Sequence, residues 1–148
     1  MSIRVVLADD SVLIREVLAR ILDSSPDIDL VASADDEPAL LAAIRETAPD
    51  VVVTDVRMPP TGTDEGVRVA ERLATARPDI GVVILSQYSD AESLSRVFDQ
   101  GRENRGWVLK ERAYADRQLV SAVETVHRGE RWIDPSVVAS GLGGASGS

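Results

Sequence analysis

The stretch Val51-Val52-Val53-Thr54-Asp55-Val56-Arg57-Met58-Pro59 places an acid directly after a run of β-branched residues. Three other apolar runs also lead into polar residues: Ile3 to Ala8 precedes Asp9-Asp10, Val82 to Leu85 precedes Ser86, and Trp107 to Leu109 precedes Lys110. In an open parallel sheet, the carboxyl ends of the strands share one edge, and ligands bind in the crevice there. The sequence therefore predicts that these polar residues meet in space.

Short β-branched runs alternate with longer segments of helical periodicity, which is typical of repeated βα units around a parallel sheet. The runs are too apolar for a sheet with one face in water, so helices are expected on both faces. The expected strands are Ile3 to Ala8, Asp29 to Ala34, Val51 to Thr54, Val82 to Leu85 and Gly106 to Leu109. The expected helices run from a Ser11 cap to about Ser24, around Leu40 to Ile44 and ending before Pro49, from about Glu65 to Ala76, from Ala91 to Gln100, and from Asp116 to Arg128.

The bulk composition narrows the class of protein. A chain of 148 residues with 44% hydrophobic content is the size of one domain with a real core. No apolar run approaches the roughly 20 residues of a membrane-spanning helix, so we expect a soluble, cytoplasmic protein. With no cysteine and one histidine, His127, any metal must be held by oxygen atoms. A net charge of -9 opposes direct binding to nucleic acid.

The acids are chemically suited to a cation. Clustered carboxylates repel one another unless they are protonated or bridged by a hard cation, and Mg²⁺ prefers oxygen ligands and pairs carboxylates with phosphate oxygens. Taken singly, each residue has a simpler interpretation. Asp9-Asp10 could cap a helix, Asp55 could open a turn, and Lys110 could be a solvated surface lysine. Their joint position at one sheet edge favours a common site.

Together, these residues resemble the response-regulator receiver domain over Ser2 to about Arg128. The resemblance implies a CheY-like α/β fold, a doubly wound parallel sheet of five strands in the order 2-1-3-4-5 with five helices. It implies that Asp55 accepts a phosphoryl group and that Ser86 and Lys110 contact that group. It also implies a Mg²⁺ site in which Asp10 and Asp55 bind directly, Asp9 binds through water, and Arg57 contributes its backbone carbonyl.

Such a domain is a signalling switch rather than an enzyme, and it assists only its own phosphorylation and dephosphorylation. The expected donor is a sensor histidine kinase, with Val12 and Leu13 as apolar contacts on the first helix. Phosphorylation would pull Ser86 inward and bias the position of Trp107, which takes the place of the family's switch aromatic. The alternative for Trp107 is plain core packing.

The chain departs from the family pattern near the site. The loop between Asp55 and Gly66 is longer than usual, and Glu111 follows the lysine where the family often has proline. Gln87 stands directly after Ser86, where a small residue is usual, and Tyr88 follows it. We expect both to overhang the phosphoryl site and modulate its hydrolysis.

The C-terminal part predicts three segments: a receiver domain at 1–128, a connector at 129–140 with a short helix at Ser136 to Ala139, and a flexible Gly/Ser tail at 141–148. The connector resembles that of the NarL/FixJ (LuxR-type) response regulators, in which it leads to a DNA-binding output domain. We therefore expect DNA contact only through an output domain absent from this chain. A stand-alone receiver acting through protein contacts, and a homodimer, are the alternatives left open.

Two other classes compete with the receiver. A phosphohydrolase of the haloacid-dehalogenase type also uses an aspartate, Mg²⁺, a hydroxyl and a lysine, but its second aspartate, two residues after the nucleophile, is replaced by Arg57. A nucleotide-binding Rossmann domain needs a glycine-rich loop where this chain has Asp9-Asp10. Arg57 therefore disfavours the phosphohydrolase, and Asp9-Asp10 disfavours the nucleotide-binding domain.

Overall fold

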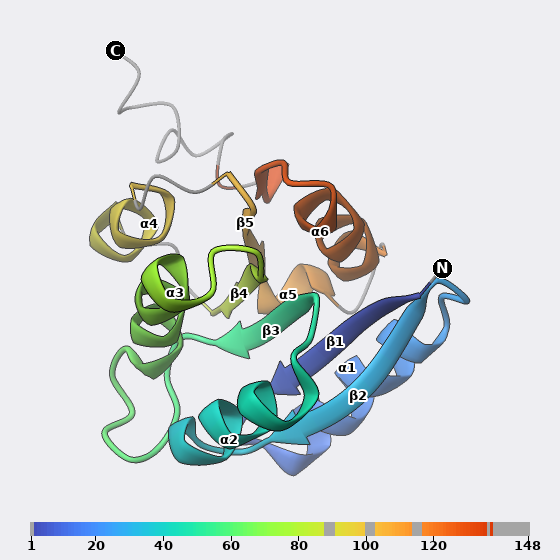
Figure 1. The fold of residues 1–148 in the computed structure, drawn as a ribbon, viewed down its shortest axis with the longest axis horizontal. Helices are drawn as coiled ribbons and strands as arrows, with labels where there is room; N and C mark the ends of the chain where they lie inside the picture. Colours follow the sequence, from blue (N-terminus) through green and yellow to red (C-terminus); the bar gives the residue numbers. More distant parts are fainter. Residues whose placement is uncertain (1, 88–90, 100–102, 114–116, 136, 138–148) are drawn as a thin grey trace.

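A computed structural model of the chain describes residues 2–87, 91–99, 103–113, 117–135 and 137. These residues form one parallel sheet with strand order β2-β1-β3-β4-β5-β6 (Figure 1). The strands are β1 Ile3–Ala8, β2 Ile28–Ala34, β3 Val51–Asp55, β4 Gly81–Ser86, β5 Arg105–Leu109 and β6 Trp132–Ile133. The helices are α1 Val12–Asp23, α2 Glu37–Thr47, α3 Glu65–Ala76, α4 Ala91–Phe98, α5 Lys110–Ala113 and α6 Gln118–His127.

Two hydrophobic clusters fill the two sides of the sheet. Successive side chains of a strand point to opposite faces, so neighbouring residues of β1 belong to different clusters. Val5 and Leu7 pack on the side covered by α1 and α6. Val6 and Ala8 pack on the side covered by α2, α3 and α4. The prediction that helices cover both faces is confirmed, and the carboxyl edge of the sheet is left to carry the site.

The strands are longer than predicted by one residue at several ends. Hydrogen-bonded pairing extends to Asp55, which lies opposite Leu85, and to Ser86, which lies opposite Leu109. Asp55 and Ser86 are therefore the last residues of β3 and β4, not the first residues of loops. Pairing with neighbouring strands continues past the point where the apolar pattern stops, because backbone bonding does not depend on side-chain polarity.

The helix predictions are largely confirmed. The Ser11 hydroxyl caps α1 by accepting from the Ile14 amide at 3.3 Å, and α3 has the predicted bounds. Helix α2 stops at Thr47, two residues before the proline. Helix α4 ends at Phe98, whereas Gln100 and Gly101, its predicted end, lie outside the described residues. Helix α6 begins at Gln118, later than predicted, and Asp116 also lies outside the described residues.

The predicted five strands and five helices are too few, since the described residues form six of each. Strand β6 pairs parallel to β5, and α5 is a four-residue helix directly after β5. The buried Asp134 fixes β6, because its amide donates to the Trp107 carbonyl at 2.9 Å and its carboxylate accepts from the Leu109 amide at 3.3 Å. Elements of two and four residues are too short to give a periodic pattern, which is why the sequence did not reveal them.

Strand β6 lies in the segment predicted as a connector. Pro135 and Val137 are helical, while Ser136, Val138 and Ala139 lie outside the described residues, as does the predicted tail. The division into 1–128, 129–140 and 141–148 stays a prediction. Within the described part of the chain, no helix has the length and apolar character needed to cross a membrane.

Candidate functional site

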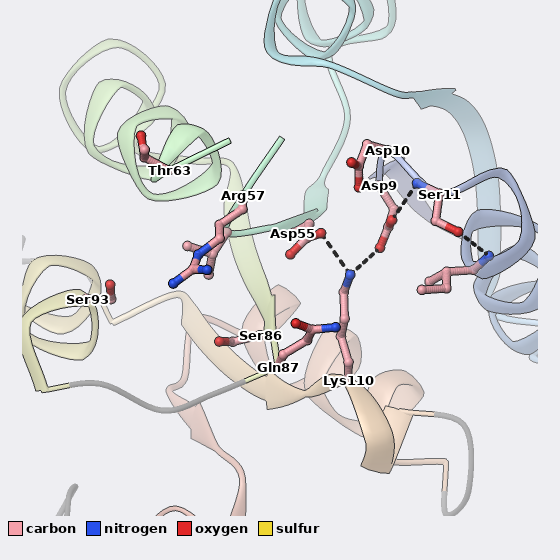
Figure 2. A pocket seen from close by; sticks show the side chains of 12 residues that line it. Asp9, Asp10, Ser11, Asp55, Arg57, Thr63, Ser86, Gln87, Ser93 and Lys110 are labelled. Atoms are coloured by element: carbon pink, nitrogen blue, oxygen red, sulfur yellow. Dashed lines mark hydrogen bonds and ion pairs between the residues drawn. The ribbon is translucent and has the colours of Figure 1, made fainter. Parts of the chain in front are cut away.

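The carboxyl edge of the sheet brings together two acids and a lysine from three distant parts of the chain. Asp9 follows β1, Asp55 ends β3, and Lys110 follows β5 as the first residue of α5. The Lys110 Nζ atom lies 2.9 Å from Asp9 Oδ2 and 2.8 Å from Asp55 Oδ2. Figure 2 shows both carboxylates converging on this ammonium group. The predicted meeting of these residues is confirmed.

The simpler interpretations of the single residues are overturned by burial. Lys110 is 7% exposed, so it is not a solvated surface lysine, and Asp55 is a buried strand residue rather than a loop acid. Asp9 is fully buried, and its second carboxylate oxygen accepts from the Ser11 amide at 2.9 Å. This local bond orients Asp9 at the entry to α1 while Ser11 itself caps the helix.

Burial and charge act against each other in the ionisation of Asp55. Burial raises the pKa of the Asp55 carboxyl and outweighs the hydrogen bond and positive charge of Lys110, which lower it, while the negative charge of Asp9 adds to the rise. For Lys110, burial opposes the charged form, but hydrogen bonds and charges from Asp55 and Asp9 raise its pKa overall. The lysine is therefore held as a cation between carboxylates.

The acids form a set of oxygen ligands that suits a divalent cation. One carboxylate oxygen from each of Asp9, Asp10 and Asp55 lies within 4.8 Å of the other two. Asp10 is exposed, whereas the other two are buried. Three carboxylates against the single lysine leave an excess of negative charge, and oxygen donors of this kind suit Mg²⁺. The donor set thus fits the predicted cofactor.

A cavity of about 340 Å³ opens beside the cluster. Besides the acids and Lys110, its lining includes Arg57, Ser86 and Gln87, all predicted at the site (Figure 2). Ser86 is buried, and the Gln87 side chain is exposed at the rim. Tyr88 lies outside the described residues, so its predicted shielding role stays a prediction.

Trp107 is fully buried on β5, in the cluster that also contains Val97 and Phe98 of α4. Its indole nitrogen has no hydrogen-bond partner among the described residues. An unpaired buried donor costs about 1 to 3 kcal/mol, so the indole is held there by packing rather than by a polar contact. The Lys110–Glu111 peptide bond, whose geometry the sequence left open, is not cis.

The sequence interpretation missed three features. Thr63 and Ser93 also line the cavity, and Glu65, at the start of α3, is fully buried and holds the loop after Asp55. The spacing of Thr61, Thr63 and Glu65 could have indicated a capped loop. A stronger signal in the sequence was not used, namely that Lys110 is its only lysine.

Comparison with known proteins agrees with this geometry. The family model for the response regulator receiver domain matches residues 5–124 of the chain. The chain is 34% identical to the oxygen regulatory protein NreC of Staphylococcus carnosus (strain TM300) over 137 residues, which cover 93% of this chain and 60% of that protein. The chain thus spans less than two thirds of this relative's length.

Solved structures show the same fold. The signal receiver domain of NarL from Mycobacterium tuberculosis superposes with a TM-score of 0.74 at 32% identity, covering 87% of this chain and 98% of that one. A LuxR-family two-component response regulator from Aurantimonas sp. SI85-9A1 gives a TM-score of 0.83 at 25% identity, with both chains covered completely at 100%. These matches also remove the haloacid-dehalogenase and Rossmann alternatives. The chain therefore belongs to the response regulator receiver domain family, as a receiver of the NarL/NreC type in two-component signalling.

Proposed function

We propose that Asp55 is the phosphoacceptor of this receiver and that a sensor histidine kinase is the donor. The observation that carries the proposal is the 2.8 Å contact between Asp55 and Lys110, which line a cavity together with Asp9, Asp10 and Ser86. A buried acid whose pKa is raised, beside a specific cation and in a cleft, is typical of a functional site.

The transfer needs positioning and charge neutralisation more than acid–base help. An Asp55 carboxylate oxygen forms the new bond to phosphorus while the bond to the histidine nitrogen of the kinase breaks. The imidazole leaves with that electron pair and regains a proton from solvent. Lys110 pairs with an oxygen of the transferred group as a point charge, and the Ser86 hydroxyl donates to another.

Asp10 and Asp55 are the proposed direct ligands of Mg²⁺, with Asp9 acting through water and Arg57 through its backbone carbonyl. The cation would supply neutralisation of phosphoryl oxygens during transfer. The support is the excess of carboxylates over ammonium groups at the cluster. Autodephosphorylation, with Gln87 and Tyr88 as modulating residues, belongs to the same proposal.

The proposed switch links the phosphoryl site to α4. Ser86 ends β4, and Trp107 lies on the adjoining strand in the hydrophobic cluster that includes Val97 and Phe98 of α4. A shift of Ser86 toward the phosphoryl group would change the space available to the indole, whose nitrogen has no hydrogen-bond partner among the described residues. The resulting change would bias two arrangements that already exist in the free protein.

The proposed kinase contact is the exposed side of α1. Val12 is 61% exposed and Leu13 is 71% exposed, and Val17 is also exposed on this helix. Apolar side chains on a helix surface beside the acid cluster suit a helical partner.

The output is proposed by analogy with longer relatives. Control of a LuxR-type DNA-binding domain, with a homodimer as the active form, is consistent with a structure of RcsB dimers bound to two parallel DNAs, which is 25% identical to this chain. The net charge of -9 makes direct DNA binding by the chain itself unfavourable. A stand-alone receiver in the cytoplasm is the alternative.

Incubation with acetyl phosphate and Mg²⁺, followed by intact-mass spectrometry, tests the proposal. The chain should gain one phosphoryl group, Asp55→Asn should gain none, and the exposed-residue control Asp99→Asn should behave like the parent. Equal phosphorylation of Asp55→Asn would contradict the assignment.

A further inference from the structure

Glu65 is a buried acid with an unusually complete set of donors. Its Oε2 atom accepts from the amides of Thr61 at 2.6 Å and Gly62 at 3.2 Å, and from the Thr61 hydroxyl. Its Oε1 atom accepts from the amides of Thr63 at 3.0 Å and Met58 at 3.5 Å. The lengthened loop after Asp55 is therefore wrapped around a single carboxylate.

One of these bonds reaches back to the proposed cation site. The Met58 amide belongs to the same peptide unit as the Arg57 carbonyl, which is the proposed backbone ligand. This peptide is not cis, so its N–H and C=O point in opposite directions. The N–H is directed to Glu65, and Arg57 lines the cavity.

The loop has little freedom to escape this arrangement. The Gly66 amide donates to the Val56 carbonyl at 2.9 Å. A Cβ atom at Gly66 would lie 1.9 Å from the Asp55 carbonyl oxygen, so the residue after Glu65 is pressed against the end of β3. The carboxylate of Glu65 is thus fixed relative to the strand that carries Asp55.

We propose that Glu65 is a positioning residue for the cation site, acting through the Arg57–Met58 peptide. Its negative charge holds the peptide N–H, orients the carbonyl on the other side of the peptide, and increases the electron density on that oxygen. Replacing a residue that orients a metal ligand typically weakens metal binding by about 10- to 100-fold. The inference rests on the proposed Mg²⁺ site.

Calorimetric titration of Mg²⁺ tests the inference on the intact chain. Glu65→Gln removes the charge, and Glu71→Gln is the matched control, because Glu71 lies on the same helix and binds the Arg96 guanidinium rather than the amides of the loop. We expect Glu65→Gln to weaken Mg²⁺ binding about tenfold, in the range seen for residues that orient metal ligands. Glu71→Gln should bind like the parent. Equal affinity for both variants would overturn the role of Glu65 and leave the proposed function intact, whereas a parent chain that binds no Mg²⁺ would overturn both.

A measurement on the parent chain covers the case in which Glu65→Gln does not fold. Backbone-amide NMR during a Mg²⁺ titration should show the Met58 amide proton moving downfield together with the signals of Asp9 and Asp55, because a cation on the Arg57 carbonyl polarises the whole peptide. A stationary Met58 signal, while the aspartate signals move, would overturn the inference.

Discussion

Asp55 and Glu65 are both buried acids, ten residues apart, yet their surroundings are opposite in kind. Glu65 is fully buried and accepts mainly from backbone amides, with the Arg68 guanidinium 3.6 Å from its carboxylate. Asp55 is 8% exposed and is surrounded by other charges, the ammonium of Lys110 and the carboxylate of Asp9. The pKa of Glu65 falls to about 2, because the hydrogen bonds to its charged form outweigh the burial that raises it. The pKa of Asp55 rises, because burial outweighs Lys110.

The difference separates a charge that stabilises the fold from a charge held for chemistry. Fixed dipoles around Glu65 replace the water it lost and leave nothing for a ligand to supply. The acids around Lys110 keep an excess of negative charge that only a cation or a proton can balance. A site kept incomplete in this way costs stability and is ready to bind.

The largest expected effect on stability comes from removing the positive charge of Lys110. Lys110→Met leaves Asp9 and Asp55 buried together without a positive partner, which should lower the free energy of unfolding by about 3 kcal/mol. Mg²⁺ should recover part of this loss, because it binds the folded state at the acids. Urea unfolding with and without Mg²⁺ measures both effects, with Arg77→Met as the control, since Arg77 pairs with Asp79 on the surface. A stability loss no greater than that of the control would mean that the acids do not need the lysine.

Glu65→Gln should cost less, about 2 kcal/mol at neutral pH, because one buried set of charged hydrogen bonds is weakened. The folded pKa of Glu65 lies below its ordinary value of 4.5, so its contribution is present above pH 4.5 and is lost as the pH falls toward 2. The difference in free energy of unfolding between Glu65→Gln and the parent should therefore narrow through that pH range. The Glu71→Gln variant should stay close to the parent throughout. Urea midpoints measured across the acid range test this, and a gap that stays constant would show that the charge of Glu65 is not what stabilises the loop.

Asp55→Asn should have the smallest effect and the opposite sign. Lys110 keeps Asp9 as a partner, and the variant removes a carboxylate whose pKa is raised, so we expect a gain of about 1 kcal/mol in the absence of Mg²⁺. The surface control Asp79→Asn should show no gain. Thermal unfolding at neutral pH measures this difference in stability. A clear loss of stability in Asp55→Asn would show that Asp55, like Glu65, stabilises the fold.

The sequence predicted the first five strands and the site at the carboxyl edge, because an apolar run followed by a polar residue is a local pattern that each strand carries. The strand order came from the resemblance to receiver domains. It could not predict β6, since two residues carry no periodicity and the pairing depends on Asp134 reaching β5. It could not predict the role of Glu65 either. Most donors to Glu65 are backbone amides, and these are the same for any sequence until the loop is folded.

The central claim is that Asp55, among all the acids near Lys110, carries the phosphoryl group. Chemical trapping tests it most directly, because borohydride reduces an aspartyl phosphate to homoserine and marks the residue in the peptide map. After treatment with acetyl phosphate and Mg²⁺, homoserine should appear at position 55 alone. Homoserine at position 9 or 10, or phosphate retained on His127 with Asp55 unmodified, would contradict the account.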